Sequence, residues 1–122
     1  MKLSEFIQYV DKVKGSQIAK KHIIEFKCII DELFLNTEKL TFSVWASPNS
    51  NSSVMALFFY KEITDEIVQS GNFESARDAA TIEVYFTEEG VSGLFDTQGK
   101  HGWEPTSKVD AVRSVLKYLE LQ

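Results

Sequence analysis

The first third of the chain places apolar residues with the period of an α-helix. A first set consists of Leu3, Phe6, Ile7, Val10 and Val13, and Gly15-Ser16 then supplies a helix stop and a new N-cap. A second, broader stripe consists of Ile18, His22, Ile23, Phe26, Ile29, Ile30, Leu33 and Phe34, and Asn36 offers an end. The pattern predicts two N-terminal helices, the second with one face against a core.

From residue 40 the period changes to two, which is typical of half-buried strands. Residues 40–46 alternate, 47–52 form a polar turn, and 54–60 are apolar on both faces, as in the most interior strand of a sheet. Residues 81–87 and 91–95 flank the turn Glu88-Glu89-Gly90. These segments predict two antiparallel hairpins.

The remaining segments predict a short helical turn, a loop and a closing helix. Residues 61–80 favour a helical turn over a prolonged strand, and residues 96–105 read as a glycine-containing loop. Ser107 and Asp110 resemble a capping box before the apolar positions Val109, Val112, Val115, Leu116 and Leu119. We predict a single α+β domain over residues 1–122. It has two N-terminal helices, about four mainly antiparallel strands in two hairpins, and a C-terminal helix packed on one face.

Composition agrees with one ordinary intracellular domain. The chain has 122 residues, of which 43% are hydrophobic, and a single cysteine, which excludes an intramolecular disulfide. It shows neither a secretory signal nor a stretch near the ~20 apolar residues of a membrane span. We therefore expect a cytoplasmic protein that does not contact a membrane.

The charge is concentrated in the middle of the chain. Residues 40–105 hold three basic side chains against ten acidic ones, and the whole chain carries a net charge of −5. Such a surface repels a nucleic-acid backbone and attracts a basic protein. Acidity alone also serves solubility, which is the plainer interpretation.

Trp45 is predicted on the polar face of its strand, together with Thr41 and Ser43. Its indole is expected either to be capped by the loop around Trp103 or to await a partner. An aromatic anchor among acidic groups is a common way to bind a basic surface. The predicted partner-binding residues are Trp45, Glu62, Asp65, Glu66, Glu83, Glu88 and Glu89.

The loop of residues 96–103 is an alternative ligand or catalytic site. It combines Asp96, Lys100, His101 and Trp103 with Gly99 and Gly102. It does not match a phosphate-binding loop, because both the glycine spacing and the hydroxyl after the lysine are missing. In this interpretation His101 is a general base and Lys100 holds an anion.

A third possibility is a homodimer. Ile24, Cys28 and Leu35 form a second apolar ridge on the long helix, outside its core stripe. The last helix, the first helix or a second copy of the chain are the candidates to cover it. The protein is accordingly predicted to be either a monomer or a chaperone-like homodimer.

Two histidines and one cysteine are the only soft ligands in the chain. They are scattered, so we predict no metal, no cofactor and no assignable catalytic residue. The preferred function is a non-catalytic inhibitor of the immunity or antitoxin type. Its expected partner is a basic protein, such as a nuclease or other nucleic-acid-binding protein, without direct contact to nucleic acid.

Overall fold

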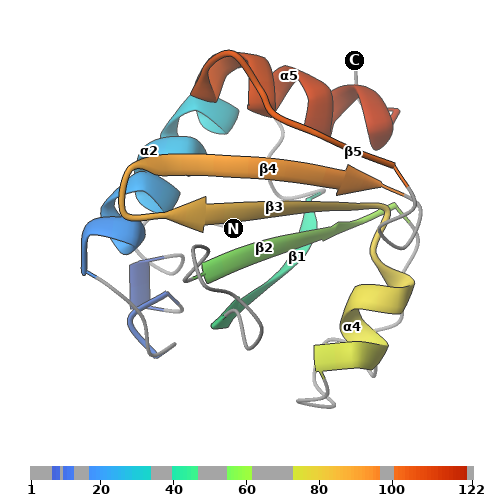
Figure 1. Cartoon of the computed structure of the whole chain (residues 1–122), viewed down its shortest axis with the longest axis horizontal. Coiled ribbons are helices and arrows are strands. Elements are labelled where there is room, and N and C mark those ends of the chain that lie inside the picture. Colours follow the sequence, from blue (N-terminus) through green and yellow to red (C-terminus); the bar gives the residue numbers. More distant parts are fainter. Residues whose placement is uncertain are drawn as a thin grey trace.

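The strands form one antiparallel sheet whose spatial order follows the chain. The computed structural model describes residues 7–8, 10–12, 17–33, 40–46, 55–61, 73–96 and 101–120. Its helices are α2 (Gln17–Leu33), α4 (Phe73–Ala79) and α5 (Lys108–Tyr118). Its strands are β1 (Thr41–Ala46), β2 (Met55–Tyr60), β3 (Ile82–Thr87), β4 (Gly90–Asp96) and β5 (His101–Trp103), in the order β1-β2-β3-β4-β5 (Figure 1).

Both predicted hairpins are confirmed. β1 pairs with β2, and β3 with β4, each in antiparallel register. In the β3–β4 turn Gly90 has a φ of +133°, a conformation that favours glycine. The Glu89 N–H donates a 3.1 Å hydrogen bond to the Thr87 hydroxyl. Local contacts thus fix the turn that carries the two adjacent glutamates.

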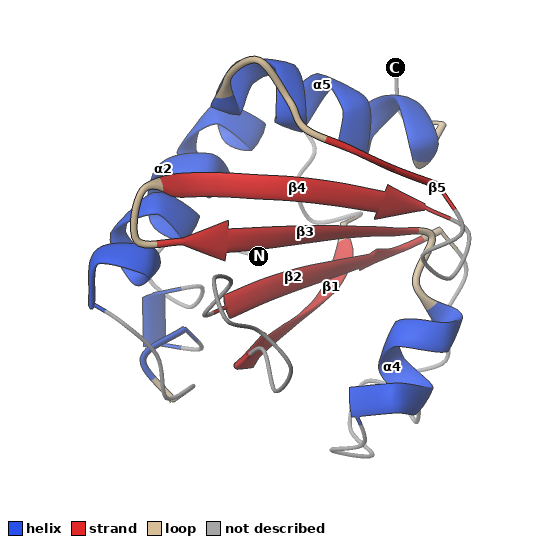
Figure 2. Ribbon diagram, in the orientation of Figure 1, coloured by secondary structure: helices blue, strands red, loops and turns tan. Residues whose placement is uncertain are grey.

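The main core lies between one face of the sheet and the helices α2 and α5 (Figure 2). α2 buries Ala19, Ile23, Phe26 and Ile30, and α5 buries Ala111, Val112, Val115 and Leu116. The Ser107 hydroxyl accepts a 3.0 Å hydrogen bond from the Asp110 N–H, so the predicted N-cap of α5 is confirmed. The helical stripes therefore mark most of this core, but Val109, predicted on the apolar face of the last helix, is exposed.

The opposite face of the sheet has a core of its own, which corrects the prediction of helices on one face only. All six residues of β2 are buried, as expected for an interior strand. Ala56, Phe58 and Tyr60 project to the second face and pack with Ala76 and Ala80, in and after α4. An apolar strand needs cover on both sides, and α4 supplies it here.

The sheet also has one strand more than predicted. Residues 101–103, expected within a loop, pair with the end of β4 as β5. A Cβ at Gly102 would lie 2.6 Å from Cε1 of Phe95, so the glycine lets that ring lie across the short strand. The α+β class is confirmed, and within the described residues the sheet has five strands rather than about four.

Parts of the predicted organisation fall outside the described residues. Of the first predicted helix, residues 7, 8, 10 and 11 are helical, and Val10 is buried in the main core. The predicted helical turn after Lys61 falls mostly on residues 62–72, which lie outside the described residues; the description resumes at residue 73, where α4 begins. None of the helices in the described ranges has the length and apolar character needed to cross a membrane.

Candidate functional site at the sheet edge

The edge formed by β4 and β5 brings together three residues that the sequence singled out. Asp96 pairs with His101, and Leu94 pairs with Trp103. Residues opposite each other in antiparallel strands project to the same face. Leu94 belongs to the main core and Trp103 packs against it, so Asp96 and His101 also face the α5 side.

α5 adds an aromatic residue to this edge that sequence reasoning missed. The Tyr118 ring lies 5.3 Å from the Trp103 ring, which in turn lies 5.9 Å from the His101 ring, measured between centroids. Tyr118 is 37% exposed, His101 is exposed and Trp103 is half-buried. Three aromatic rings therefore form a row that solvent reaches. We call Asp96, His101, Trp103 and Tyr118 the β5-edge site.

Asp96 supplies a buried negative charge beside this row. Asp96 is only 8% exposed, and the Tyr118 hydroxyl donates a hydrogen bond to its carboxylate. Burial and this hydrogen bond raise the pKa of the Tyr118 phenol, which therefore stays a donor at neutral pH. Oδ1 of Asp96 is buried and has no hydrogen-bond partner in the described part of the chain. A buried acceptor without a hydrogen bond carries a desolvation cost, and a hydrogen-bond donor that reaches it removes this cost.

The chemistry of the β5-edge site suits a cationic group. Indole and phenol faces attract guanidinium and ammonium ions, and a buried carboxylate forms charge-assisted hydrogen bonds with them. Arginine offers both a planar face for stacking and several N–H donors for the carboxylate. Lys100, the fourth member of the predicted loop, lies outside the described residues.

The acidic residues predicted to bind a partner differ in their exposure. Glu88 and Glu89 are exposed at the β3–β4 turn, as a partner-binding role requires. Glu83 is only 2% exposed, so its side chain is not part of the outer surface. Glu62, Asp65 and Glu66 lie outside the described residues.

Trp45 projects away from the main core, as predicted. The prediction that the loop around Trp103 covers it is wrong. β1 and β5 lie at opposite edges of the sheet, so Trp103 does not approach Trp45. The Trp45 ring packs instead against Phe73 of α4, at 5.7 Å between centroids. Its indole N–H donates to the Ser43 hydroxyl at 2.6 Å. Trp45 is therefore half-buried beneath α4, and its polar atom is already bonded.

Glu83 lies within the second face, between strand neighbours that are aromatic. Phe58 and Phe95 are its partners on the adjacent strands, and the Tyr85 hydroxyl donates to its Oε1 at 2.7 Å. Its Oε2 and the Nε of Arg77 are buried without hydrogen-bond partners among the described residues. Desolvation raises the pKa of the Glu83 carboxyl above 4.5, while the Tyr85 hydrogen bond and the Arg77 charge act in the opposite direction.

This raised pKa predicts the sign of a pH effect on stability. A carboxyl with a higher pKa in the folded chain binds more protons when folded, so it loses stability as the pH rises from 4.5 through the folded pKa. We expect the stability of Glu83→Gln relative to that of the wild type to increase as the pH rises above 4.5. Urea unfolding at several pH values measures this difference. Parallel pH profiles for the two proteins would contradict it.

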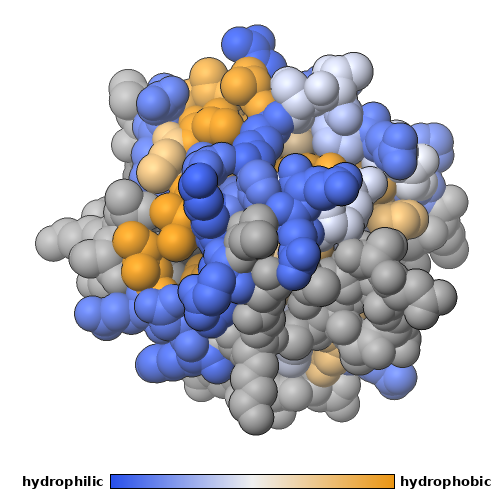
Figure 3. Space-filling model, turned by 60° about the vertical axis from the view of Figure 1, so that its left-hand side comes forward, coloured by the Kyte–Doolittle hydropathy of each residue, from blue (hydrophilic) through white to orange (hydrophobic). Residues whose placement is uncertain are grey.

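His22, predicted within the core stripe of α2, lies at the end of the molecule where α2, α5 and the β3–β4 turn meet. Its Nε2 lies 3.0 Å from the Glu88 carbonyl oxygen, and its Nδ1 lies 2.6 Å from Nζ of Lys108. Lys108 also donates to the Glu25 carboxylate, and this hydrogen bond holds the pKa of Glu25 below its ordinary value. Figure 3 shows the molecule turned so that the side with α2 comes forward, and a band of hydrophilic residues crosses this surface.

The contacts of His22 determine where its proton lies. A carbonyl can only accept and an ammonium can only donate, so Nε2 carries the hydrogen and Nδ1 accepts. We expect long-range ¹H–¹⁵N spectra of the neutral ring to show the Nε2–H tautomer of His22. A spectrum with the proton on Nδ1 would contradict this arrangement of His22.

Lys108→Met should lower the free energy of unfolding by about 1 kcal/mol, because it removes the donor that joins α5 to α2.

The predicted dimer ridge is only partly visible. Ile24 is half-buried and packs against the main core, and Cys28 is a half-buried free thiol. Leu35 lies outside the described residues. The packing of Ile24 gives this part of the ridge an intramolecular contact.

The described residues thus offer the β5-edge site, whose chemistry suits a cationic group, and the exposed acidic turn of Glu88 and Glu89. In the described ranges, no three His, Cys, Asp or Glu side chains are grouped to hold a metal ion. Comparisons with protein family models, curated proteins and solved structures found no significant match to this chain.

Proposed function

We propose that this protein is a non-catalytic binding domain that recognises a basic protein, as an inhibitor of the immunity or antitoxin type would. The β5-edge site receives an arginine or lysine side chain of that partner. The observation that carries the proposal is the buried Asp96 carboxylate, whose Oδ1 has no described partner. Beside it lie the exposed rings of His101 and Tyr118 and the half-buried ring of Trp103.

The rest of the surface contributes to the approach of the partner. Glu88 and Glu89 are exposed on a turn whose backbone is fixed by Thr87 and His22. They lie at the opposite end of β4 from Asp96, about 20 Å away for a strand of this length. The net charge of −5 and this acidic turn increase the rate of encounter, while the aromatic and carboxylate groups hold the complex.

The test compares the affinity of matched variants for one purified partner. The tagged protein captures the partner from lysate of its source cell, and calorimetry then measures the dissociation constant. Asp96→Asn should weaken binding by about 30-fold or more, because it removes one member of a buried charge pair. Glu104→Gln removes one exposed negative charge beside β5 and should change the affinity less than about threefold.

A Glu88→Lys/Glu89→Lys variant separates steering from anchoring. It should lower the association rate and its dependence on salt, with little change in the dissociation rate. Equal affinity of the wild type and Asp96→Asn would exclude the β5-edge site as the interface. A captured partner without a basic surface would exclude the proposed function itself.

A further inference from the structure

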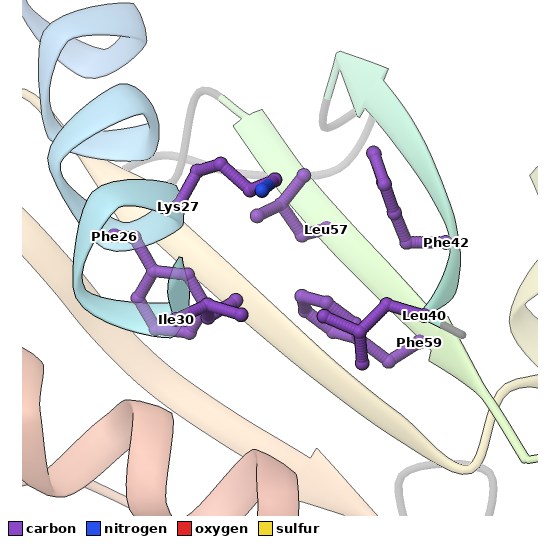
Figure 4. A pocket seen from close by; sticks show the side chains of 7 residues that line it. All are labelled: Phe26, Lys27, Ile30, Leu40, Phe42, Leu57 and Phe59. Carbon is purple, nitrogen blue, oxygen red and sulfur yellow. The ribbon is translucent and has the colours of Figure 1, made fainter. Parts of the chain in front are cut away.

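The two edges of the sheet differ in how far they are covered. Within the described residues, β1 and β5 are the edge strands. Ser43 of β1 is only 1% exposed. On the α2 side of β1, Phe42 packs with Phe59 around a space of about 10 Å³, room for roughly one water molecule (Figure 4). In β5, by contrast, His101 and Gly102 are exposed. A second molecule can therefore reach the backbone of β5.

Two carbonyl groups show which backbone atoms of β5 face outward. The Leu94 oxygen lies 3.4 Å from the position of a Cβ on Gly102, and the Trp103 oxygen lies 3.6 Å from that of a Cβ on Gly93. Both oxygens thus point into the β4–β5 pair, and Leu94 and Trp103 are a hydrogen-bonded pair. Because such pairs alternate with non-hydrogen-bonded ones, the N–H and C=O of Gly102 point away from β4.

We propose that β5 binds an extended segment of the basic partner, which adds to the sheet as a further strand. An edge strand offers unpaired backbone groups that such a segment can use. One residue of the segment pairs with Gly102 through two backbone hydrogen bonds in antiparallel register. The partner is that of the proposed function, on which this inference rests.

The α5 side of the added strand holds the basic residue. The next residue of the segment after the one opposite Gly102 stands opposite His101, in line with Asp96. Two strand spacings, roughly 10 Å, separate its Cα from that of Asp96. An arginine side chain bridges this distance toward the carboxylate and lies against the His101 and Trp103 rings on the way. Arginine is therefore the residue expected there.

The other side of the added strand holds an apolar residue. Gly102 has no side chain, and the Phe95 ring extends across it, because a Cβ at Gly102 would lie 2.6 Å from Cε1 of that ring. The residue opposite Gly102 projects to the same face and meets the ring, which belongs to a residue 37% exposed. A β-branched apolar residue covers the ring and favours extended backbone. The expected segment has such a residue followed by arginine.

A second copy of this chain lacks that pattern. Its own β5 presents His101, Gly102 and Trp103, without an arginine. Each copy also carries a net charge of −5, so two copies repel one another. Charge complementarity therefore favours a basic partner over self-association at this edge.

The test is an NMR titration of the full ¹⁵N-labelled chain with the peptide acetyl-Ser-Thr-Val-Arg-Thr-Ser-amide. We expect the peptide to shift the Gly102 amide signal in a saturable manner and to slow its exchange with solvent. Citrulline in place of arginine removes the charge and should weaken binding at least about tenfold. N-methylation of the valine removes the donor for the Gly102 carbonyl and should also weaken binding at least about tenfold.

Two variants of the protein test the same contact from the other side. Gly102→Pro removes the outward N–H, and proline is tolerated at such a position of an edge strand. Gly102→Ala is the matched control, because both variants place a Cβ beside the Phe95 ring. We expect Gly102→Pro to bind the unmodified peptide at least about fivefold more weakly than Gly102→Ala does.

The possible outcomes separate strand addition from the proposed function. No saturable shift, or equal binding of the N-methylated and unmodified peptides, would overturn strand addition. If citrulline weakens binding and N-methylation does not, strand addition is wrong while recognition of a cation at the β5-edge site stands. Equal binding of the citrulline and arginine peptides would overturn both. Dimers seen by light scattering in the wild type and lost in Gly102→Pro would show that a second copy occupies the edge, which also overturns the proposal.

Discussion

Phe58→Ala is expected to lower the free energy of unfolding by about 3–5 kcal/mol. Phe58 is fully buried at the centre of the second face. Its ring lies 6.3 Å from the Trp45 ring, 5.3 Å from the Phe73 ring and 6.3 Å from the Tyr85 ring. Truncation would leave a cavity among rings held by three different elements, so the site cannot collapse easily.

Guanidinium unfolding measures this loss as a shift of the midpoint at unchanged slope. Val109→Ala is the matched control, because Val109 is an exposed apolar residue of α5 and should cost about 0.5 kcal/mol or less. A loss below about 1 kcal/mol for Phe58→Ala would mean that α4 does not close the second face. The description of two cores would then be wrong.

The second large effect is expected on the main core. Phe26→Ala should also cost about 3–5 kcal/mol, because Phe26 is fully buried and joins α2 to two strands. Its ring lies 6.2 Å from the Phe59 ring and meets the Phe86 ring edge-on at 5.6 Å. Unfolding by urea at 25 °C, followed by circular dichroism, measures the change.

Phe26→Leu is the control for the loss of volume. Leucine fills most of the space, so the variant should lose clearly less stability than Phe26→Ala. Similar losses for leucine and alanine would indicate that the aromatic contacts, and not the filled volume, determine the effect. A loss for Phe26→Ala below about 1 kcal/mol would contradict the packing of α2 on the sheet.

Much of the fold could be predicted because its signals are local. Alternation in β1 and β3 and the stripes of α2 and α5 each span at least five residues. The turn Glu88-Glu89-Gly90 indicated β4. β5 was missed because three residues, one of them glycine, show no periodicity. α4 has seven residues and buries Ala76, so it shows almost no apolar stripe. The apolar character of both faces of β2 was the available sign that a second layer covers the sheet.

The candidate site could be predicted only in part. Asp96, His101 and Trp103 attracted notice because they lie close together in the sequence, whereas Tyr118 is fifteen positions beyond Trp103. Their contact depends on how α5 crosses the sheet, which no local pattern records. Glu83 was assigned to the surface because strand alternation placed it on the polar face. Its burial follows from Phe58 and Phe95 beside it and from the second core on that face.

The sequential order of the strands affects how the chain acquires its structure. Each strand pairs with the one synthesised just before it, so the sheet can form progressively from short-range contacts. α5, in contrast, contacts α2, and the His22–Lys108 contact spans 86 positions. On the ribosome, the part of the main-core face that α5 covers therefore stays exposed until residues 108–118 emerge. During that interval the nascent chain is most prone to aggregate and most in need of a chaperone.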